Sequence, residues 1–273
     1  MPRISICILF LLFAGRTTFA QPASKTDSFV YACSPCHLPC DTIRHSEPGT
    51  CPYCSMPLEK ISLTAMRERI RKYLLVPQQS VTVCFYLQDG VEVLDFAGPM
   101  EVFDAAGFKV FTVSRNKSSI KAQGILNAVA NYTIEDAPPA DVIAFFGGET
   151  RASTSDTALL SWVRTRSRSS AYTLSVCTGA FILAKAGVLD NLTATTYHTA
   201  IDGLAKASPS TTVLHNVRFV DNGKVITTAG VSAGIDGALH LVERLKGREF
   251  ARTVADLIEY DKWVPEQGMI IKN

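Results

Sequence analysis

Residues 171–187 read AYTLSVCTGAFILAKAG and join a hydrophobic run directly to a helical pattern. The run from Ala171 to Val176 is almost continuously apolar, which is typical of a strand buried on both faces of a sheet. The helical pattern begins immediately after Cys177, with no intervening loop. This stretch therefore predicts a parallel α/β sheet that carries a cysteine at a strand-to-helix turn.

The same alternation of strand and helix patterns extends over residues 80–265. Further strands are predicted at Val81–Leu87, Lys109–Ser114 and Asp141–Phe146. Helices are predicted at Leu94–Ala106, Asp156–Arg168, Thr178–Ala186, Ala233–Lys246 and Arg248–Tyr260. The alternation predicts an α/β domain, a flavodoxin-like doubly wound parallel sheet with helices on both faces. In such folds the ligand crevice opens at the carboxyl ends of the strands.

Composition narrows the class of protein. The 273 residues allow one large domain with a small companion. Lys and Arg number 27 and Asp and Glu 25, giving a net charge of +2, so the chain lacks the concentrated basic charge with which nucleic-acid binders displace counterions from phosphates. We therefore expect no nucleic-acid partner.

The first twenty residues have the three-part pattern of a secretory signal peptide. Arg3 precedes an apolar run at 4–14, and the small-residue site Thr18-Phe19-Ala20 follows. We expect cleavage after residue 20 and a periplasmic or secreted protein. The alternative is an uncleaved anchor, but the run is shorter than the roughly 20 apolar residues that span a bilayer. No later segment reaches that length, so we expect no membrane association after cleavage.

A cysteine-rich module occupies residues 29–60, FVYACSPCHLPCDTIRHSEPGTCPYCSMPLEK. Two Cys-x2-Cys pairs can bring four thiolates around one metal ion. A module this small needs a metal ion or disulfides to fold. Two disulfides remain the alternative, although five cysteines would leave one unpaired. The expected metal ligands are Cys33, Cys36, Cys51 and Cys54, with His37 and Cys40 as alternative ligands and His45 as a spare donor.

The module resembles the heavy-metal-binding domain of copper-efflux ATPases and metal-efflux pump subunits. The matching positions are Tyr31, Cys33, His37, Pro39, Pro48, Gly49, Cys51, Pro52, Cys54, Met56 and Leu58. Cys36 and Cys40 raise the thiolate content above that of the family, which favours zinc or copper as the ion. A linker helix is expected within residues 61–79, where Ser62–Leu75 is amphipathic and Pro77 ends the pattern.

Cys177 is the expected nucleophile. A helix N-terminus that follows a cysteine stabilises its thiolate, so we expect a lowered pKa and high reactivity. The alternative is a buried core cysteine, the role expected for Cys84 in the first strand. Asp95 follows the first strand and either caps a helix or reaches Cys177 as its acid/base partner.

Two further features lie near strand ends. Gly147 and Gly148 follow the third strand and could supply an oxyanion hole together with the amide of Thr178, although a Gly-Gly pair can also be a simple turn. His198 is a further catalytic candidate, although a lone histidine is more often a surface or packed residue.

As a set, these segments resemble the ThiJ/PfpI family of the class I glutamine-amidotransferase-like superfamily. The matching segments are Leu-Asp-x-x-Gly-Pro-x-Glu, Phe-Gly-Gly, Cys-Thr-Gly-Ala, Ala-Thr-Thr-x-His and Thr-Ala-Gly-Val-Ser-Ala-Gly-Ile-Asp. Cys177-Thr178-Gly179-Ala180 and Asp95 look most like the branch that contains isonitrile hydratase and the ligand domains of AraC-type regulators.

The resemblance implies Cys177 as nucleophile, Asp95 as its acid/base partner and Thr178 as a residue that orients substrate or water. It implies a homodimer. It also implies an enzyme without a cofactor in this domain, either a lyase of the hydratase type or a hydrolase, that acts on a small electrophilic molecule. Members of the branch often have tryptophan directly after the histidine, whereas Thr199 follows His198 here. The resemblance therefore gives less support to a catalytic role for His198.

The competing interpretation is a non-catalytic periplasmic protein that senses a ligand, a metal or redox stress. The regulators carry a DNA-binding helix-turn-helix after this domain, whereas this sequence ends at Asn273. We therefore expect an enzyme or a periplasmic sensor rather than a transcriptional regulator. One hypothesis for the module is that it delivers or withholds a metal ion that inhibits the Cys177 thiolate.

Overall fold

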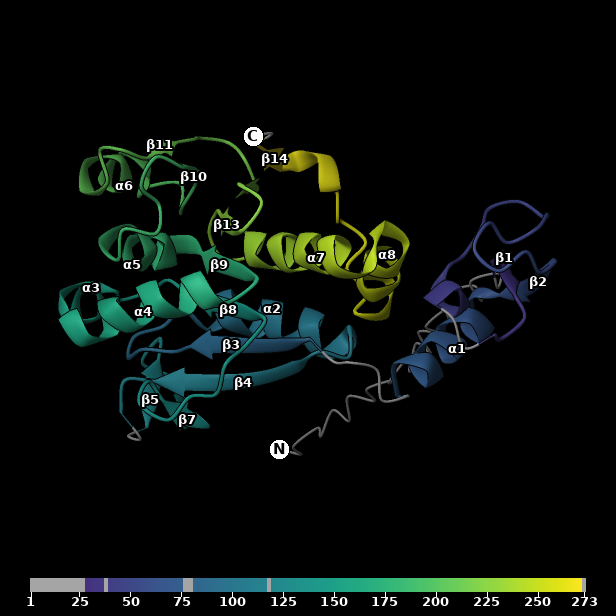
Figure 1. Cartoon of the computed structure of the whole chain (residues 1–273), viewed down its shortest axis with the longest axis horizontal. Helices are drawn as coiled ribbons and strands as arrows, with labels where there is room; N and C mark the ends of the chain where they lie inside the picture. The colour runs from purple at the N-terminus through teal and green to yellow at the C-terminus, as the bar shows by residue number, and fades with distance from the viewer. Residues whose placement is uncertain (1–27, 37–38, 76–80, 117–118, 272–273) are drawn as a thin grey trace, which may run out of the picture.

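The computed structural model describes residues 28–36, 39–75, 81–116 and 119–271 (Figure 1). The predicted signal peptide at 1–20, the candidate ligand His37 and the helix break at Pro77 lie outside these residues. Within the described ranges, no helix combines the length and hydrophobicity needed to cross a membrane.

The elements follow the predicted alternation closely. The strands are β1 (Phe29–Cys33), β2 (Leu58–Ser62), β3 (Thr82–Tyr86), β4 (Lys109–Ser114), β5 (Ile120–Ala122), β6 (Leu126–Ala128), β7 (Tyr132–Thr133), β8 (Val142–Phe145), β9 (Tyr172–Val176), β10 (Thr193–Ala194), β11 (Thr212–Val213), β12 (Phe219–Asp221), β13 (Val225–Thr228) and β14 (Met269–Ile270). The helices are α1 (Leu63–Leu75), α2 (Val93–Ala105), α3 (Arg151–Ser155), α4 (Thr157–Ser169), α5 (Ala180–Lys185), α6 (Ile201–Ala207), α7 (Ala233–Lys246) and α8 (Arg248–Leu257), with 3-10 turns η1 (Pro39–Thr42), η2 (Cys177–Gly179) and η3 (Pro265–Gln267).

Strands of the α/β domain form one large sheet. Among the described residues its order is β14-β12-β13-β9-β8-β3-β4-β7. Neighbouring strands are parallel except β12 and β13, which form an antiparallel hairpin. The hairpin turns at Gly223, whose amide donates to the Asp221 carboxylate over 2.6 Å. The predicted α/β fold is confirmed, and the sheet is mostly rather than wholly parallel.

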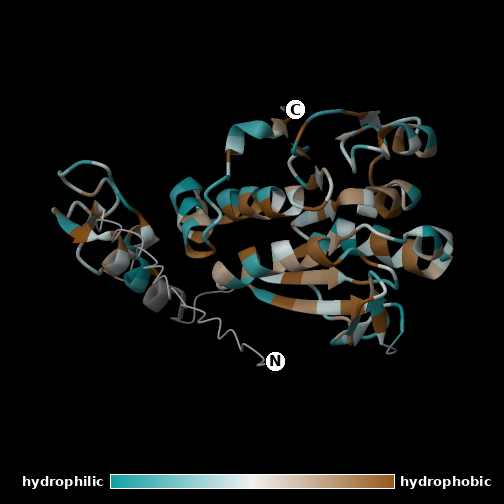
Figure 2. Cartoon of the chain, turned by 180° about the vertical axis from the view of Figure 1, so that it is seen from behind, coloured by the Kyte–Doolittle hydropathy of each residue, from teal (hydrophilic) through white to brown (hydrophobic). Residues whose placement is uncertain are grey.

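Helices cover both faces of this sheet, as predicted. Strand β3 alternates its side chains between two separate hydrophobic clusters, with Val83 and Phe85 in one and Cys84 and Tyr86 in the other. Helices α2, α7 and α8 complete the first cluster, and α4 and α5 complete the second. Hydrophobic residues accordingly concentrate in the strands and on the inner helix faces (Figure 2). Cys84 is a core residue, 3% exposed.

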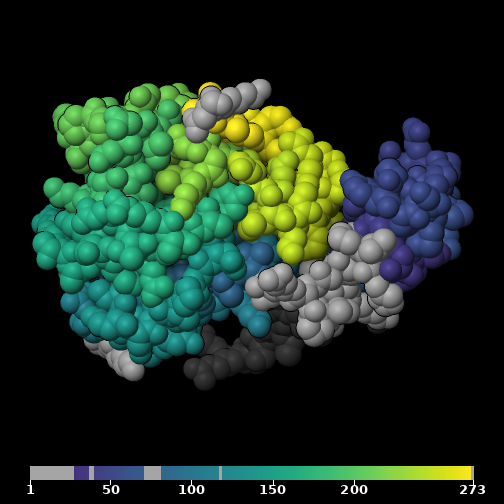
Figure 3. All heavy atoms as spheres, in the orientation of Figure 1, coloured from purple at the N-terminus to yellow at the C-terminus, as the bar shows by residue number. Residues whose placement is uncertain are grey.

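The cysteine-rich module lies beside the end of the α/β domain formed by α7 and α8. Its strands β1 and β2 pair antiparallel, and Met66 and Ile70 of α1 pack with Leu257 at the end of α8. Arg44 forms an ion pair with Asp256. The module appears as a separate lobe against α7 and α8 (Figure 3). The arrows of β3 and β4 point away from it, so the module lies opposite the carboxyl ends of these strands (Figure 1).

Helix α7 approaches the sheet closely because it carries small residues on its inner face. A Cβ at Gly237 would overlap the methyl carbon of Thr228 in β13, which is fully buried. The glycine at this position thus allows the close approach of helix and strand.

We predict that Gly237→Ala lowers the free energy of unfolding by about 1–3 kcal/mol, because overpacking a close-packed core forces side chains or backbone to shift. The matched control is Gly203→Ala in α6, where the new Cβ would lie 3.4 Å from the Phe181 ring. The control should be neutral or stabilising by up to about 1 kcal/mol, since alanine favours helix. Urea unfolding of both variants measures the difference, and equal stability of the two would contradict the prediction.

Candidate active site and metal-binding cluster

Cys177 lies at the turn where β9 ends and η2 begins. Its φ is +57°, in the left-handed region that non-glycine residues rarely adopt, and the residue is 6% exposed. Two hydrogen bonds fix this backbone: the Cys177 amide donates to Ala229 O over 3.2 Å, and Thr196 Oγ1 donates to Cys177 O over 2.7 Å. Such strain persists only where the surroundings enforce it, and it is common at functional sites.

Asp95 is the partner of Cys177. It lies in the first turn of α2, fully buried, and one carboxylate oxygen accepts the Gly147 amide over 2.9 Å. The other oxygen accepts the Val231 amide over 3.2 Å. The Cys177 thiol lies close enough to this carboxylate that the two groups shift each other's pKa. The helix-cap alternative for Asp95 is wrong, since Glu92 occupies the N-cap position.

The Asp95 carboxyl and the Cys177 thiol together carry one negative charge at neutral pH. Burial raises the pKa of Asp95 to about 6, more than the Gly147 amide and the neighbouring Cys177 thiol lower it. Burial, together with the charge of Asp95, raises the pKa of Cys177 to about 12. The expected lowering of the Cys177 pKa is therefore wrong. The amides of Thr178 and Val231 do lower it, but desolvation and the neighbouring carboxylate dominate.

Gly147 and Gly148 lie against this pair. A Cβ at Gly147 would lie 2.6 Å from Thr178 Oγ1 and 2.8 Å from Asp95 Oδ2, so only glycine leaves that space open. Gly148 has a φ of +91°, and a Cβ there would overlap Gly90 O. Because the Gly147 amide donates to Asp95, it does not serve as an oxyanion donor as expected. The amides of Gly148 and Thr178 remain candidates for that role.

Thr178 and His198 differ in their relation to the pair. Thr178 is half-buried, and its hydroxyl donates to Gly148 O over 3.2 Å, which places it beside Asp95 and the glycines. His198 is exposed, and its ring lies 4.3 Å from the ring of Tyr197. Thr178 thus lies at the site. The ring contact of His198 is with Tyr197, the residue before it in the chain.

Three site residues were missed by sequence reasoning. Val231 has a φ of +52°, a strained conformation for a β-branched residue, and its amide is aimed at Asp95. Thr196 holds the Cys177 carbonyl. Gln88 follows β3, and its Nε2 donates to Phe146 O over 3.0 Å. The position of Gln88 directly after the predicted strand Val81–Leu87 could have identified it as a site residue. Val231 acts through its backbone amide, so its residue type could not have identified it.

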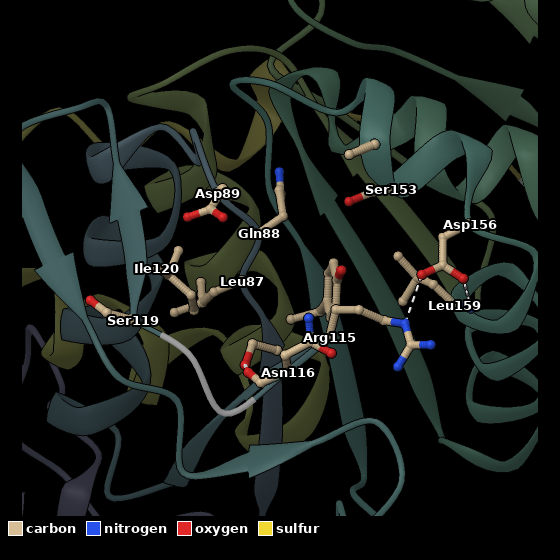
Figure 4. Close-up of a pocket in the computed structure, with 13 residues that line it drawn as sticks. Leu87, Gln88, Asp89, Arg115, Asn116, Ser119, Ile120, Ser153, Asp156 and Leu159 are labelled. Atoms are coloured by element: carbon tan, nitrogen blue, oxygen red, sulfur yellow. Dashed lines mark hydrogen bonds and ion pairs between the residues drawn. The ribbon is translucent and has the colours of Figure 1, made fainter.

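A pocket of about 160 Å³ lies beside the site, at the carboxyl ends of β3 and β4 (Figure 4). Gln88 and Asp89, which follow β3, line it together with Ser153 of α3. Arg115 follows β4, and its Nε donates to Asp156 over 2.7 Å. Gln88 lines this pocket and also contacts the candidate active site, because its side-chain amide donates to Gly147 O over 3.3 Å.

The cysteine-rich module brings its five thiols into one cluster. Cys33, Cys40, Cys51 and Cys54 have sulfur atoms that all lie within 4.8 Å of one another. A second group, also within 4.8 Å, combines Cys33, Cys36 and Cys40 with a carboxylate oxygen of Asp41. The cysteines of the described residues are free thiols. Four sulfurs at these separations could hold a metal ion.

The four-sulfur group differs from the expected ligand set in one member. Cys40 joins Cys33, Cys51 and Cys54 in place of Cys36, whose sulfur lies 3.1 Å from Asp41 Oδ1 instead. Burial raises the pKa of Cys33 to about 12, and the Met56 amide lowers the pKa of Cys54 to about 7. A bound cation would displace the thiol protons, so binding would release protons.

Comparisons with known proteins identify the α/β domain. Residues 81–244 match the model of the DJ-1/PfpI family. An isonitrile hydratase from Pseudomonas putida is 32% identical over 183 residues, which cover 66% of this chain and 79% of that protein. A ThiJ/PfpI family protein from Pseudomonas syringae is 29% identical, with a TM-score of 0.63, over 68% of this chain and 77% of that chain.

The chain belongs to the DJ-1/PfpI family. Its relatives also include the HTH-type transcriptional regulator CdhR of Pseudomonas aeruginosa, 26% identical over 67% of this chain and 56% of the regulator. The matched region therefore occurs both in an enzyme and in a regulator.

We predict that alkylation of Cys177 by iodoacetamide rises through an apparent pKa near 6 and then reaches a plateau. Ionised Asp95 can accept the thiol proton during attack, and its pKa is about 6. A second rise is expected as the pH approaches 12, where the thiol itself ionises.

The variant Asp95→Asn should lose the step near pH 6 and show a single step below pH 12, because removing the carboxylate charge lowers the pKa of Cys177. Mass spectrometry of the Cys177 peptide across pH 4–11 measures both profiles. Identical profiles for the two proteins would show that Asp95 does not control the thiol.

Proposed function

We propose that the protein is a cysteine-dependent enzyme that adds water to a small electrophile, with an isonitrile as the best-supported substrate class. The observation that carries this proposal is the buried Asp95 carboxylate beside Cys177, which lies at a strained strand-to-helix turn. The similarity to isonitrile hydratase supports the choice of substrate.

In the first step, the Cys177 sulfur attacks the terminal carbon of the isonitrile and forms a carbon–sulfur bond. The thiol proton passes to Asp95 and from there to the same carbon, which gives a thioimidate. A raised pKa suits Asp95 to this relay, because a group that titrates near neutral pH both accepts and releases protons. The amides of Thr178 and Gly148 would stabilise charge on the adduct.

In the second step, water adds to the thioimidate carbon and one water proton moves through Asp95 to the nitrogen. The carbon–sulfur bond then breaks, and the hydroxyl proton returns to the pair. The product is an N-substituted formamide, and the free thiol is restored. Thr178 Oγ1, beside Gly148 O, would orient the water.

We further propose that the module binds a thiophilic ion, zinc or copper, through its cysteine cluster. The protein would be exported to the periplasm or secreted, and it would act as a homodimer. The alternative to catalysis is ligand or oxidant sensing at Cys177. The regulator relatives favour this second function.

We predict that the purified protein converts a simple alkyl isonitrile to the corresponding formamide. Cys177→Ser should abolish turnover, and Asp95→Asn should reduce kcat/KM by about 100-fold or more, the usual contribution of a positioned proton-transfer group. Gas chromatography of the product measures the rate.

Cys84→Ala is the matched control, since Cys84 is a buried thiol in β3 that lies outside the site. This variant should retain activity. Absence of turnover in the wild type on isonitriles and on reactive aldehydes, combined with saturable ligand binding, would support the sensing function instead.

We predict that signal-peptide cleavage leaves a mature chain that begins at Gln21. Intact-mass analysis of protein recovered from the periplasmic fraction of an expressing bacterium checks this. An uncleaved N-terminus in the cytoplasmic fraction would refute export.

A further inference from the structure

The cysteine-rich module contains two overlapping groups of metal-type ligands. The first is made of Cys33, Cys40, Cys51 and Cys54, and the second of Cys33, Cys36, Cys40 and Asp41. Each group has four ligand atoms that lie within 4.8 Å of one another, the separation that a four-coordinate ion requires. Cys33 and Cys40 belong to both groups.

We propose that the module binds two zinc-type divalent ions in one cluster, with the thiolates of Cys33 and Cys40 bridging them. A thiolate sulfur has three lone pairs and can bind two cations at once. Cys51 and Cys54 then complete the first ion's ligands, and Cys36 and Asp41 complete those of the second. This inference rests on the proposed metal-binding function and extends it from one ion to two.

The positions of the second group's own ligands support the proposal. Cys36 Sγ lies 3.4 Å from Cys40 Sγ and 3.1 Å from Asp41 Oδ1, so its sulfur is directed toward the bridging thiolate and the carboxylate. Asp41 is only 4% exposed. Its carboxylate accepts the Cys36 amide over 2.8 and 3.1 Å, which holds it beside the Cys36 sulfur, and zinc accepts both carboxylate and thiolate ligands.

Charge balance also permits the second ion. An ion held by four thiolates leaves a site with two net negative charges. The second ion brings two positive charges, and the ligands that it adds, Cys36 and Asp41, bring two negative ones. The net charge of the cluster therefore does not change, and no additional counter-charge has to be buried.

The bridging residue Cys40 also lines a cavity of about 600 Å³ between the module and the α7–α8 junction. Lys246, Arg248 and Glu249 also line it. The cavity would give ions a route to the bridging thiolate.

The test measures zinc per chain in the full-length mature protein. The reduced protein is loaded with excess Zn²⁺, freed of unbound metal by gel filtration, and analysed by elemental analysis and native mass spectrometry. We expect two ions per chain in the wild type, and one in both Cys36→Ser and Asp41→Asn. The matched controls Glu47→Gln, an exposed carboxylate of the same module, and Cys84→Ala should retain two.

Cobalt substitution tests the bridge itself. Two Co²⁺ ions that share thiolates are magnetically coupled, so the paramagnetic resonance signal per cobalt should fall as the second ion binds. The fall should be absent in Cys36→Ser. This readout depends on metal–metal proximity and would not change through a purely structural role of Cys36.

The outcomes separate this inference from the proposed function. One ion in the wild type would overturn the two-ion cluster and leave metal binding intact. No ion in the wild type would overturn both. Two ions that persist in Cys36→Ser or Asp41→Asn, or that show no magnetic coupling, would overturn the assignment of the bridged ligands.

Discussion

The buried carboxylate of Asp95 makes the interactions on which the candidate active site depends. It joins three parts of the chain that are distant in sequence: helix α2, the Gly147 turn after β8, and the Val231 turn before α7. Each contributes a hydrogen-bonding group that would otherwise be buried without a partner. The strained backbone of Cys177 lies against this carboxylate, so the position of the thiol is set by the same contacts.

That arrangement determines the chemistry of the thiol more than the helix that follows it. A helix N-terminus alone would favour a thiolate at neutral pH. Here the helix begins as a short 3-10 turn, and a carboxylate lies beside the sulfur, so the pair retains one proton between pH 6 and 12. The site therefore resembles an acid/base pair with a nucleophilic member, rather than a permanently ionised thiolate.

The sequence predicted the elements that carry strong hydrophobic periodicity, including the strands that precede Gly147 and Cys177. The hairpin of β12 and β13 was missed because its strands are short, and only the turn at Gly223 marks it. For the site, residue type identified Cys177 and Asp95. The roles of backbone amides, at Gly147 and Val231, depend on φ angles and on loops that meet only in three dimensions. The exchange of Cys36 for Cys40 in the four-sulfur group likewise depends on local folding of η1, which spacing alone does not specify.

Helix α7 connects the two chemical centres of the molecule. It starts directly after the turn whose amide bonds Asp95, and it ends at Gly247, which lines the cavity beside Cys40. Its 14 residues span about 21 Å at 1.5 Å per residue. The cluster lies at the end of the domain opposite the strand ends that carry the thiol. Metal occupancy could then influence the thiol through a displacement of this helix along its axis. The close contact of Gly237 with Thr228 would resist that displacement.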